Sequence, residues 1–394
     1  WYGAVAILSC LMAPDKEAAA VFVFLGFYPI VKPRLEKRKF PWLGKAAGRV
    51  INRTWYDRGD ESMSEENGRT DLTWRELLDE GGARLSEAGV PDAGTDAWYL
   101  MEAAFGIDRV HYYLDQNRPI HAERLEKGYG RYQEMLQKRA ERIPLQQILG
   151  MQDFMGMTFS VDENVLIPRQ DTETLVEWVL RDYPEKDLKL LDMCTGSGCI
   201  AISLAVLGGY QNVTAVDISE AALRVAKKNA RRLFLIQKGT ARSESFQVSE
   251  DPWCIRLKTW LAKGPRLQAE IEEHSLTLLQ SNLFQAVEAD VMYDVIVSNP
   301  PYIPSAVIDG LEPEVRDHEP RLALDGSEDG LYFYRVLALE CSKHLNKGGC
   351  VYFEIGYDQA EAVSRILTIA GYREIEVIKD EPGLDRVVKA RWNR

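Results

Sequence analysis

Short apolar stretches alternate with amphipathic segments from residue 188 to the end of the chain. The apolar stretches have the length of buried strands, and the segments between them have helical spacing. We predict strands at Leu188–Met193, Val213–Asp217, Leu276–Gln280, Tyr293–Val297 and Cys350–Ile355. We predict helices at Glu173–Arg181, Ile200–Leu207, Glu220–Arg232, Leu331–Leu345 and Gln359–Ala370. Because Glu374–Ile378 and Arg386–Arg391 resemble a closing hairpin, the pattern predicts a parallel α/β sheet of the doubly wound kind with an antiparallel end.

Residues 63–145 carry helical spacing without any strand pattern. Thr73 followed by Glu76 matches a capping box, and Gly89-Val90-Pro91 ends the helix that begins there. Further helices are predicted at Ala93–Phe105, Asp108–Leu114 and Ala122–Glu141. A small all-α domain of this kind is either a binding module or a cap that packs on the next domain.

Residues 146–166 change character, because aromatic and β-branched residues now surround two glycines, Gly150 and Gly156. This pattern predicts a β-hairpin linker. Residues 167–394 then form the α/β domain, and either Asp171 or Thr172 is expected to cap its first helix. The alternation is lost over Phe234–Glu273, so we interpret residues 234–273 as an insertion in that domain.

Residues 1–62 differ from the rest of the chain. They contain two apolar runs, each shorter than the ~18–20 residues that span a membrane, and a basic cluster over residues 32–39. Three interpretations stay open: the end of a small membrane protein joined upstream, a membrane-surface anchor, or a buried helical extension. Membrane contact is expected only through residues 1–40. Asp57–Asp71 has the composition of a linker, and the functional domain could begin at Met63.

Composition narrows the class of protein. The formal net charge of −12 argues against stable binding of nucleic acid, because phosphate contacts need a basic surface. The six cysteines form no C-x-x-C pair and the five histidines have no metal-ligand spacing. We therefore expect no metal site, no disulfide framework and a cytoplasmic location.

A glycine-containing turn from Asp192 to Cys199 joins the first strand to its helix. Strand, glycine turn and helix are the usual arrangement for binding a nucleotide. The turn lacks the spacing and the lysine of a phosphate-binding loop, so we expect a ligand without phosphates. Asp217 ends the next strand, where a carboxylate can bind ribose hydroxyls, although it could instead cap the following helix. Leu283 follows the third strand, where an apolar side chain could flank a base.

The strand at Tyr293–Val297 ends at Asn299-Pro300-Pro301-Tyr302. Proline lacks an N–H and fixes φ, so the strand stops and the loop after it is stiff. Asn299 offers a side-chain carbonyl, Pro300 a backbone carbonyl and Tyr302 a flat ring. Two acceptors and one aromatic face suit a planar NH2 group, so the loop predicts a site for an amide or an exocyclic amine. A plain turn between two elements is the alternative.

Together these motifs resemble the release factor glutamine methyltransferases of the HemK type, over about Leu72 to Arg391. The matching segments are Ile167-Pro168-Arg169, Asp171-Thr172-Glu173, Asp192–Gly198, Asp217, Asn299–Tyr302, Glu319–Leu324, Asp329-Gly330-Leu331, Glu354-Ile355-Gly356 and Asp385–Val388. The resemblance implies a Rossmann-like, S-adenosylmethionine-dependent enzyme of translation termination. Such enzymes methylate the side-chain amide of the glutamine in the Gly-Gly-Gln motif of class I peptide chain release factors.

The resemblance also implies roles for particular residues. The methionine part of S-adenosylmethionine would be lined by Cys194, Thr195, Gly196, Ser197 and Gly198. Asp217 would hold the ribose, and Leu283 would lie by the adenine. The substrate loop would be Asn299, Pro300, Pro301 and Tyr302, with Asn299 also bordering the cofactor. In that loop Asn299 and Pro300 would accept the NH2 hydrogens and Tyr302 would pack on the amide. The helical domain would help to bind the release factor.

The sequence departs from the family pattern at three places. Gln170 stands where the family usually has proline, Leu283 stands where some members have an aromatic residue, and Phe234–Glu273 has no counterpart. The insertion puts the fit of the helix after Asp217 in question more than the catalytic loop.

Two other functions stay open at this point. An adenine-N6 methyltransferase acting on DNA or RNA shares the Asn-Pro-Pro-Tyr loop and would have to flip its base out. A non-catalytic protein that only binds a release factor is the third. For the enzyme, the sulfonium methyl is electrophilic enough to need no metal. We find no general base beside Asn299 in the sequence, so the proton is expected to leave to water.

Overall fold

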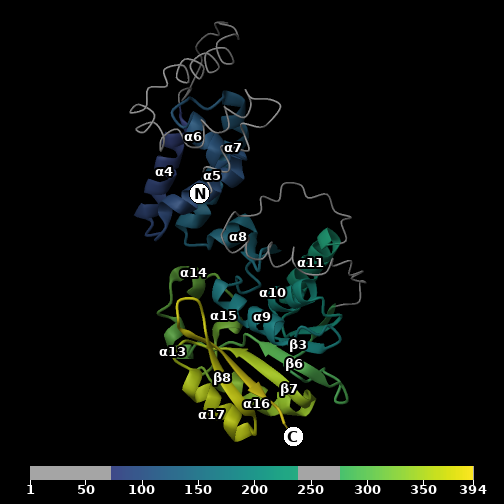
Figure 1. Ribbon diagram of the computed structural model, residues 1–394. Coiled ribbons are helices and arrows are strands. Elements are labelled where there is room, and N and C mark those ends of the chain that lie inside the picture. Colours follow the sequence, from purple (N-terminus) through teal and green to yellow (C-terminus); the bar gives the residue numbers. More distant parts are fainter. Residues whose placement is uncertain (1–71, 238–275, 394) are drawn as a thin grey trace, which may run out of the picture. The chain divides into compact units, whose positions relative to one another are not determined.

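The computed structural model of the chain describes residues 72–237 and 276–393 (Figure 1). The predicted extension at residues 1–62 and most of the predicted insertion lie outside these residues. Within the described ranges, no helix has the length and apolar character that crossing a membrane requires.

From residue 72 onward, where the structure describes it, the helical domain contains five helices. They are α4 (Trp74–Glu87), α5 (Ala93–Phe105), α6 (Arg109–Asp115), α7 (Ala122–Ala140) and α8 (Leu145–Leu149). The capping box at Thr73 is confirmed: its side chain accepts from the Glu76 N–H, and the Glu76 carboxylate accepts from the Thr73 N–H. Aromatic side chains dominate the core of this domain, where Trp74, Phe105 and Tyr132 pack together. The domain therefore has a hydrophobic core of its own.

The predicted hairpin linker begins later than expected, because its first residues belong to helix α8. The hairpin itself, β1 (Met151–Phe154) and β2 (Met157–Ser160), is confirmed. Asn229 of the following domain fixes its position. The Asn229 side chain accepts from the Ser160 N–H at 2.7 Å and donates to the Ser160 carbonyl at 3.0 Å.

A seven-stranded sheet in the order β5-β4-β3-β6-β7-β9-β8 forms the centre of the α/β domain (Figure 1). Its strands are β3 (Lys189–Met193), β4 (Asn212–Asp217), β5 (Leu276–Gln280), β6 (Tyr293–Ser298), β7 (Leu345–Glu354), β8 (Arg373–Lys379) and β9 (Asp385–Arg391). The first five are parallel, and β9 pairs antiparallel with β7 and β8. The predicted parallel sheet with an antiparallel end is confirmed. The strand order reverses between β3 and β6, and open α/β sheets bind ligands at such a point.

Helices cover both faces of the sheet (Figure 1). One hydrophobic core contains residues of α9 (Gln170–Asp182), α10 (Cys199–Ser203) and α11 (Glu220–Gln237), and the other contains residues of α16 (Tyr332–His344) and α17 (Ala360–Ala370). The predicted helix at Ile200–Leu207 is split into α10 and a π-helical turn at Leu204–Gly208. Three short helices follow β6: α13 (Ser305–Ile308), α14 (Pro313–Arg316) and α15 (Arg321–Leu324).

Two helix ends differ from the prediction. Helix α9 begins at Gln170 with Arg169 as its N-cap, so neither Asp171 nor Thr172 caps it. The Thr172 side chain instead accepts a hydrogen bond from Asn299. Helix α11 continues to Gln237, past the start that we predicted for the insertion.

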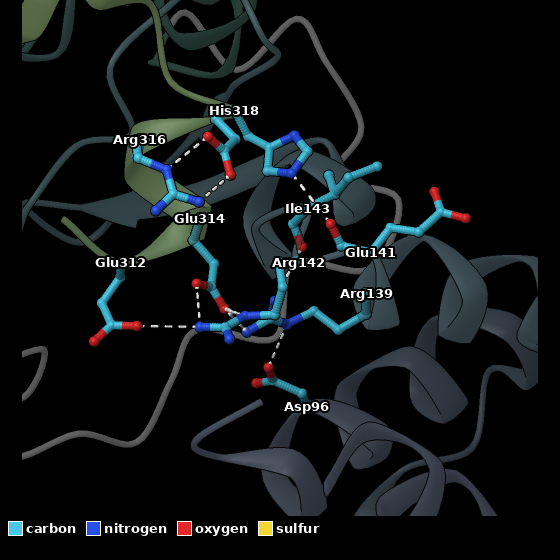
Figure 2. Close-up of polar contacts among 10 residues, drawn as sticks. Asp96, Arg139, Glu141, Arg142, Ile143, Glu312, Glu314, Arg316 and His318 are labelled. Atoms are coloured by element: carbon cyan, nitrogen blue, oxygen red, sulfur yellow. Dashed lines mark hydrogen bonds and ion pairs between the residues drawn. The ribbon is translucent and has the colours of Figure 1, made fainter. Parts of the chain in front are cut away.

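An ion-pair cluster joins the helical domain to the segment after β6 (Figure 2). Arg139 of α7 contacts Glu314 of α14 at 2.8 Å and Asp96 of α5 at 2.7 Å. Arg142 reaches the same Glu314 carboxylate at 2.6 Å. The cluster therefore ties α5 and α7 to the chain segment that leads away from Asn299.

Candidate active site

A cavity of about 360 Å³ lies at the carboxyl ends of β3, β4 and β6. A volume of this size is within the usual range for a small-molecule site. Eight of the residues predicted from the sequence line it: Cys194, Thr195, Gly196, Ser197, Asp217, Leu283, Asn299 and Pro301. The structure thus brings the glycine turn, the acidic strand end and the Asn-Pro-Pro-Tyr loop together around one cavity.

The glycine turn after β3 has a left-handed backbone conformation that residues with a side chain rarely adopt. Cys194, Gly196 and Gly198 all have positive φ, at 65°, 55° and 80°. A Cβ on Gly196 would have no atom within 4 Å, so this residue leaves the backbone open to the cavity. Gly198 does not line the cavity. A Cβ there would lie 2.9 Å from Ile202 and 3.1 Å from Ala226, so Gly198 allows α10 and α11 to approach the turn.

Asp192 holds the glycine turn in place through hydrogen bonds, a role that the sequence did not indicate. Its Oδ2 accepts from the Thr195 hydroxyl at 2.6 Å and from the Ala201 N–H at 3.1 Å. Burial raises the pKa of this carboxyl to about 7. The side chain is fully buried, so it shapes the turn from within the protein.

Asp217 ends β4 at the edge of the cavity, as predicted. Its Oδ2 accepts from the Gly196 N–H at 2.8 Å and its Oδ1 from the Ser219 N–H at 2.9 Å. Burial raises its pKa, and these backbone hydrogen bonds oppose that shift. Since each carboxylate oxygen has a second lone pair, Asp217 can still accept from a ligand hydroxyl.

Leu283 is one of two non-glycine residues with positive φ on the cavity wall, at 50°, and Cys194 is the other. Backbone strain of this kind is concentrated at binding sites. Ile218 lines the cavity as well, so Leu283 and Ile218 supply apolar surface that suits a base. Positive φ at a leucine has no sequence signal, whereas the apolar character of the position was predicted.

Asn299 enters the cavity from the end of β6. Its Nδ2 donates to the Thr172 hydroxyl at 3.3 Å. The preceding Ser298 is anchored by its hydroxyl, which donates to the Met193 carbonyl at 2.6 Å. With Nδ2 engaged by the protein, the side-chain oxygen of Asn299 is the atom left to accept from a ligand.

Two predicted residues of this loop do not line the cavity. Pro300 is buried, and Tyr302 packs against the core next to α16. Burial raises the pKa of Tyr302, and its carbonyl accepts from Gln359 Nε2 at 3.0 Å. A Cβ on Gly330 would lie 2.4 Å from that carbonyl, so the Asp-Gly-Leu motif needs glycine for close approach.

Arg169 also lines the cavity, and it was visible in the sequence only as part of the Ile-Pro-Arg motif. Its Nη2 donates to Glu319 Oε2 at 2.7 Å, and Glu319 Oε1 accepts from the Ile167 N–H at 3.1 Å. Burial raises the pKa of Glu319, against the attraction of Arg169. The segments Ile167-Pro168-Arg169 and Glu319-Pro320-Arg321 thus hold each other at the cavity.

Glu354 is a titratable group close to Asn299, where the sequence showed no general base. It ends β7, and its side chain is almost completely buried. Burial raises its pKa to about 7, while hydrogen bonding by Thr172 and Asn299 opposes that shift. The residue was visible in the sequence only as part of the Glu-Ile-Gly motif.

The doubly wound sheet, the glycine turn, the acidic end of β4 and the Asn-Pro-Pro-Tyr loop together define a methyltransferase site. A family model for the methyltransferase domain matches residues 184–247. The chain is an S-adenosylmethionine-dependent methyltransferase.

The particular family follows from the relatives. A model described as the PrmC N-terminal domain matches residues 76–150. The release factor glutamine methyltransferase of Geobacter sulfurreducens is 38% identical over 319 residues, which cover 81% of this chain and 96% of the relative. The enzyme of that name from Caulobacter vibrioides is 36% identical over 77% of this chain and 91% of the relative. The chain belongs to the release factor glutamine methyltransferase family.

The chain is also similar to a solved structure, the protein-(glutamine-N5) methyltransferase (release factor-specific) from Alicyclobacillus acidocaldarius. It is 27% identical and covers 60% of this chain and 100% of its own chain, with a TM-score of 0.30. The family assignment rests on the sequence relatives.

Proposed function

We propose that this enzyme methylates the side-chain amide nitrogen of the glutamine in the Gly-Gly-Gln motif of class I peptide chain release factors, and that Asn299 holds that amide. The observation that carries the proposal is the hydrogen bond from Asn299 Nδ2 to Thr172, which leaves Asn299 Oδ1 to accept from the substrate NH2. The names of the relatives support the substrate class.

The residues around the cavity fit S-adenosylmethionine. Thr195, Gly196 and Ser197 lie where the amino acid part would contact exposed backbone. Asp217 offers carboxylate oxygens for the ribose hydroxyls, and Leu283 offers an apolar wall for the adenine. When bound, S-adenosylmethionine supplies an electrophilic methyl group.

The main contribution of the protein to the reaction is to position the amide nitrogen against the methyl group. An amide nitrogen is a poor nucleophile because its lone pair is delocalised, and correct orientation of reactants can contribute ~7–11 kcal/mol. Asn299 Oδ1 would accept one of the NH2 hydrogens as positive charge grows on the nitrogen. The same role for the Pro300 carbonyl stays a prediction from the family resemblance, because Pro300 does not line the cavity. Pro301 lines the cavity beside Asn299, and its ring limits how far the loop can move. Tyr302 supports the loop from the core side.

The helical domain is proposed to help bind the release factor. Arg139 and Arg142 link the helical domain to the segment after Asn299. A release factor bound to the helical domain would therefore be held at a fixed position relative to the cavity. The net charge of −12 makes stable nucleic acid binding unfavourable. We place the enzyme in the cytoplasm, where release factors act.

The test is transfer of labelled methyl from S-adenosylmethionine to three acceptors. These are a class I release factor, the same factor with the Gly-Gly-Gln glutamine changed to alanine, and mixed nucleic acid. Label on the first alone is the expected result. Label on nucleic acid would instead assign the enzyme to the adenine-N6 methyltransferases, and equal label on both release factors would place the modified residue elsewhere.

A further inference from the structure

Three elements meet beneath the Asn299 side chain. Asn299 follows β6, Glu354 ends the neighbouring strand β7, and Thr172 lies in the first turn of α9. The parallel pairing of Ser298 with Phe353 places the ends of β6 and β7 side by side. Thr172 and Glu354 are 3% and 1% exposed, so water competes little for their polar groups.

Glu354 is a buried carboxyl with an incomplete set of partners. Among the residues that the structure describes, its Oε2 has no hydrogen-bond partner. Hydrogen bonding by Thr172 and Asn299 favours its charged form, as does the guanidinium of Arg386, whereas Asp171 opposes it. The Tyr334 hydroxyl donates to the backbone carbonyl of Glu354 at 2.7 Å and fixes the backbone there. A buried, incompletely paired carboxyl next to a substrate-binding amide calls for a role.

The donors and acceptors of these side chains allow one consistent arrangement. In its ionised form the Glu354 carboxylate can only accept, and in that form it draws the O–H of Thr172 toward itself. The Thr172 oxygen then presents its lone pairs to Asn299, and only the NH2 group of Asn299 can donate to them. This agrees with the hydrogen bond from Asn299 Nδ2 to Thr172 Oγ1. It follows that Asn299 Oδ1 is turned into the cavity.

We propose that Thr172, itself oriented by Glu354, is a positioning residue that sets which end of the Asn299 amide faces the substrate. Without this constraint the Asn299 side chain can rotate and present its NH2 group to the NH2 of the glutamine, where neither group accepts. The inference rests on the proposed function, because it assigns to Asn299 an acceptor role toward a glutamine amide.

The kinetic test compares Thr172→Val with Thr172→Ser in the full chain. Valine keeps the shape and removes the hydroxyl, whereas serine keeps the hydroxyl. We expect Thr172→Val to lower kcat about tenfold, the order of one lost hydrogen bond, with the KM for S-adenosylmethionine unchanged. Thr172→Ser should restore most of kcat. Equal kcat for the valine variant and the wild type would overturn the proposal, and so would equal losses in both variants.

A double-mutant cycle with Asn299→Ala separates positioning from a general structural effect. If Thr172 acts through Asn299, Thr172→Val lowers kcat no further in the Asn299→Ala background. The same tenfold loss in both backgrounds would mean that Thr172 acts by another route and would refute the assignment.

A second measurement does not depend on the release factor. In protein with ¹⁵N-labelled asparagine, the side-chain NH2 signal of Asn299 is identified by its absence in Asn299→Ala. We expect its hydrogens to exchange with solvent more slowly in the wild type and Thr172→Ser than in Thr172→Val. If the wild type shows this protection but does not methylate a release factor, the proposed function fails and the Thr172 to Asn299 contact stands. Equal exchange in all three proteins would contradict the contact itself.

Discussion

Arg139 of α7 and Glu314 of α14 form an ion pair, with 2.8 Å between Nη2 and Oε1. Both side chains are largely buried, at 6% and 16% exposure. Arg139 also contacts Asp96 at 2.7 Å, so one guanidinium pairs with two carboxylates that lie on different elements (Figure 2). Arg139 therefore links α5 and α7 to the segment after Asn299.

Replacing Arg139 should destabilise the fold strongly. Arg139→Gln leaves Asp96 and Glu314 without their shared cation, and breaking a buried pair in this way costs about 3–5 kcal/mol. The free energy of unfolding in urea measures the effect. The matched control is Arg224→Gln, since Arg224 pairs with Glu220 on the surface of α11, where such a pair is worth about 0–1 kcal/mol. Similar losses in the two variants would contradict the importance of the buried cluster.

The same cluster predicts a pH dependence of stability. Burial alone would raise the pKa of Glu314, but hydrogen bonds from Arg142 and Arg139 outweigh it and lower the pKa to about 2, from 4.5 in the unfolded chain. A carboxyl whose pKa is lowered by folding stabilises the protein above the unfolded pKa. That contribution is lost as the pH falls from about 4.5 toward 2.

The measurement compares the wild type with Glu314→Gln from pH 7 to pH 3. The difference in free energy of unfolding should be largest at neutral pH and should shrink below pH 4.5. Glu312→Gln is the control, because the Glu312 side chain is 74% exposed and pairs with Arg142 at 3.2 Å. A Glu314→Gln difference that is independent of pH would show that the charge of Glu314 is not what stabilises the junction.

Gly196 and Gly198 should respond differently to alanine. Both have positive φ, so each substitution strains the backbone, by roughly 1–2 kcal/mol. At Gly198 the added Cβ would also approach Ile202 and Ala226, so Gly198→Ala should lower the free energy of unfolding further. At Gly196 the Cβ meets no protein atom and points where the ligand is proposed to lie, so Gly196→Ala should chiefly weaken S-adenosylmethionine binding.

Urea unfolding and titration with S-adenosylmethionine distinguish the two glycines. If Gly196→Ala binds S-adenosylmethionine as tightly as the wild type, the turn does not approach the ligand closely. If Gly198→Ala is no less stable than Gly196→Ala, the packing role of Gly198 is wrong.

The sequence allowed the fold and part of the site to be predicted, for reasons that are local. Asp217 and Asn299 each follow an apolar strand directly, and parallel strands bring their carboxyl ends to one edge. The same reasoning placed Leu283 and the glycine turn at that edge. The prolines marked where β6 ends but not which side of the loop faces the cavity. Pro300 and Tyr302 were expected to contact the substrate amide, and they do not line the cavity.

The residues that hold the cavity residues in place could not be predicted, because their contacts join segments that are far apart in the sequence. Thr172 and Asn299 are 127 residues apart, and Ile167 and Glu319 are 152 apart. Either Asp171 or Thr172 was expected to cap α9, since both residue types often do so. In the structure α9 begins earlier, at Gln170, and the Thr172 hydroxyl instead accepts a hydrogen bond from Asn299. Such a partner is visible only once β6 and α9 are placed side by side.

The most direct test of the account is mass spectrometry of a class I release factor after incubation with S-adenosylmethionine and either the wild-type enzyme or Asn299→Ala. The account predicts one added methyl group on the Gly-Gly-Gln glutamine with the wild type. It predicts a rate lower by ~10²-fold or more with Asn299→Ala, the scale for loss of a group that stabilises transition-state charge, with S-adenosylmethionine binding retained. Methylation of that glutamine by Asn299→Ala at the wild-type rate would contradict the role of Asn299, and a methyl group on any other residue would contradict the proposed substrate.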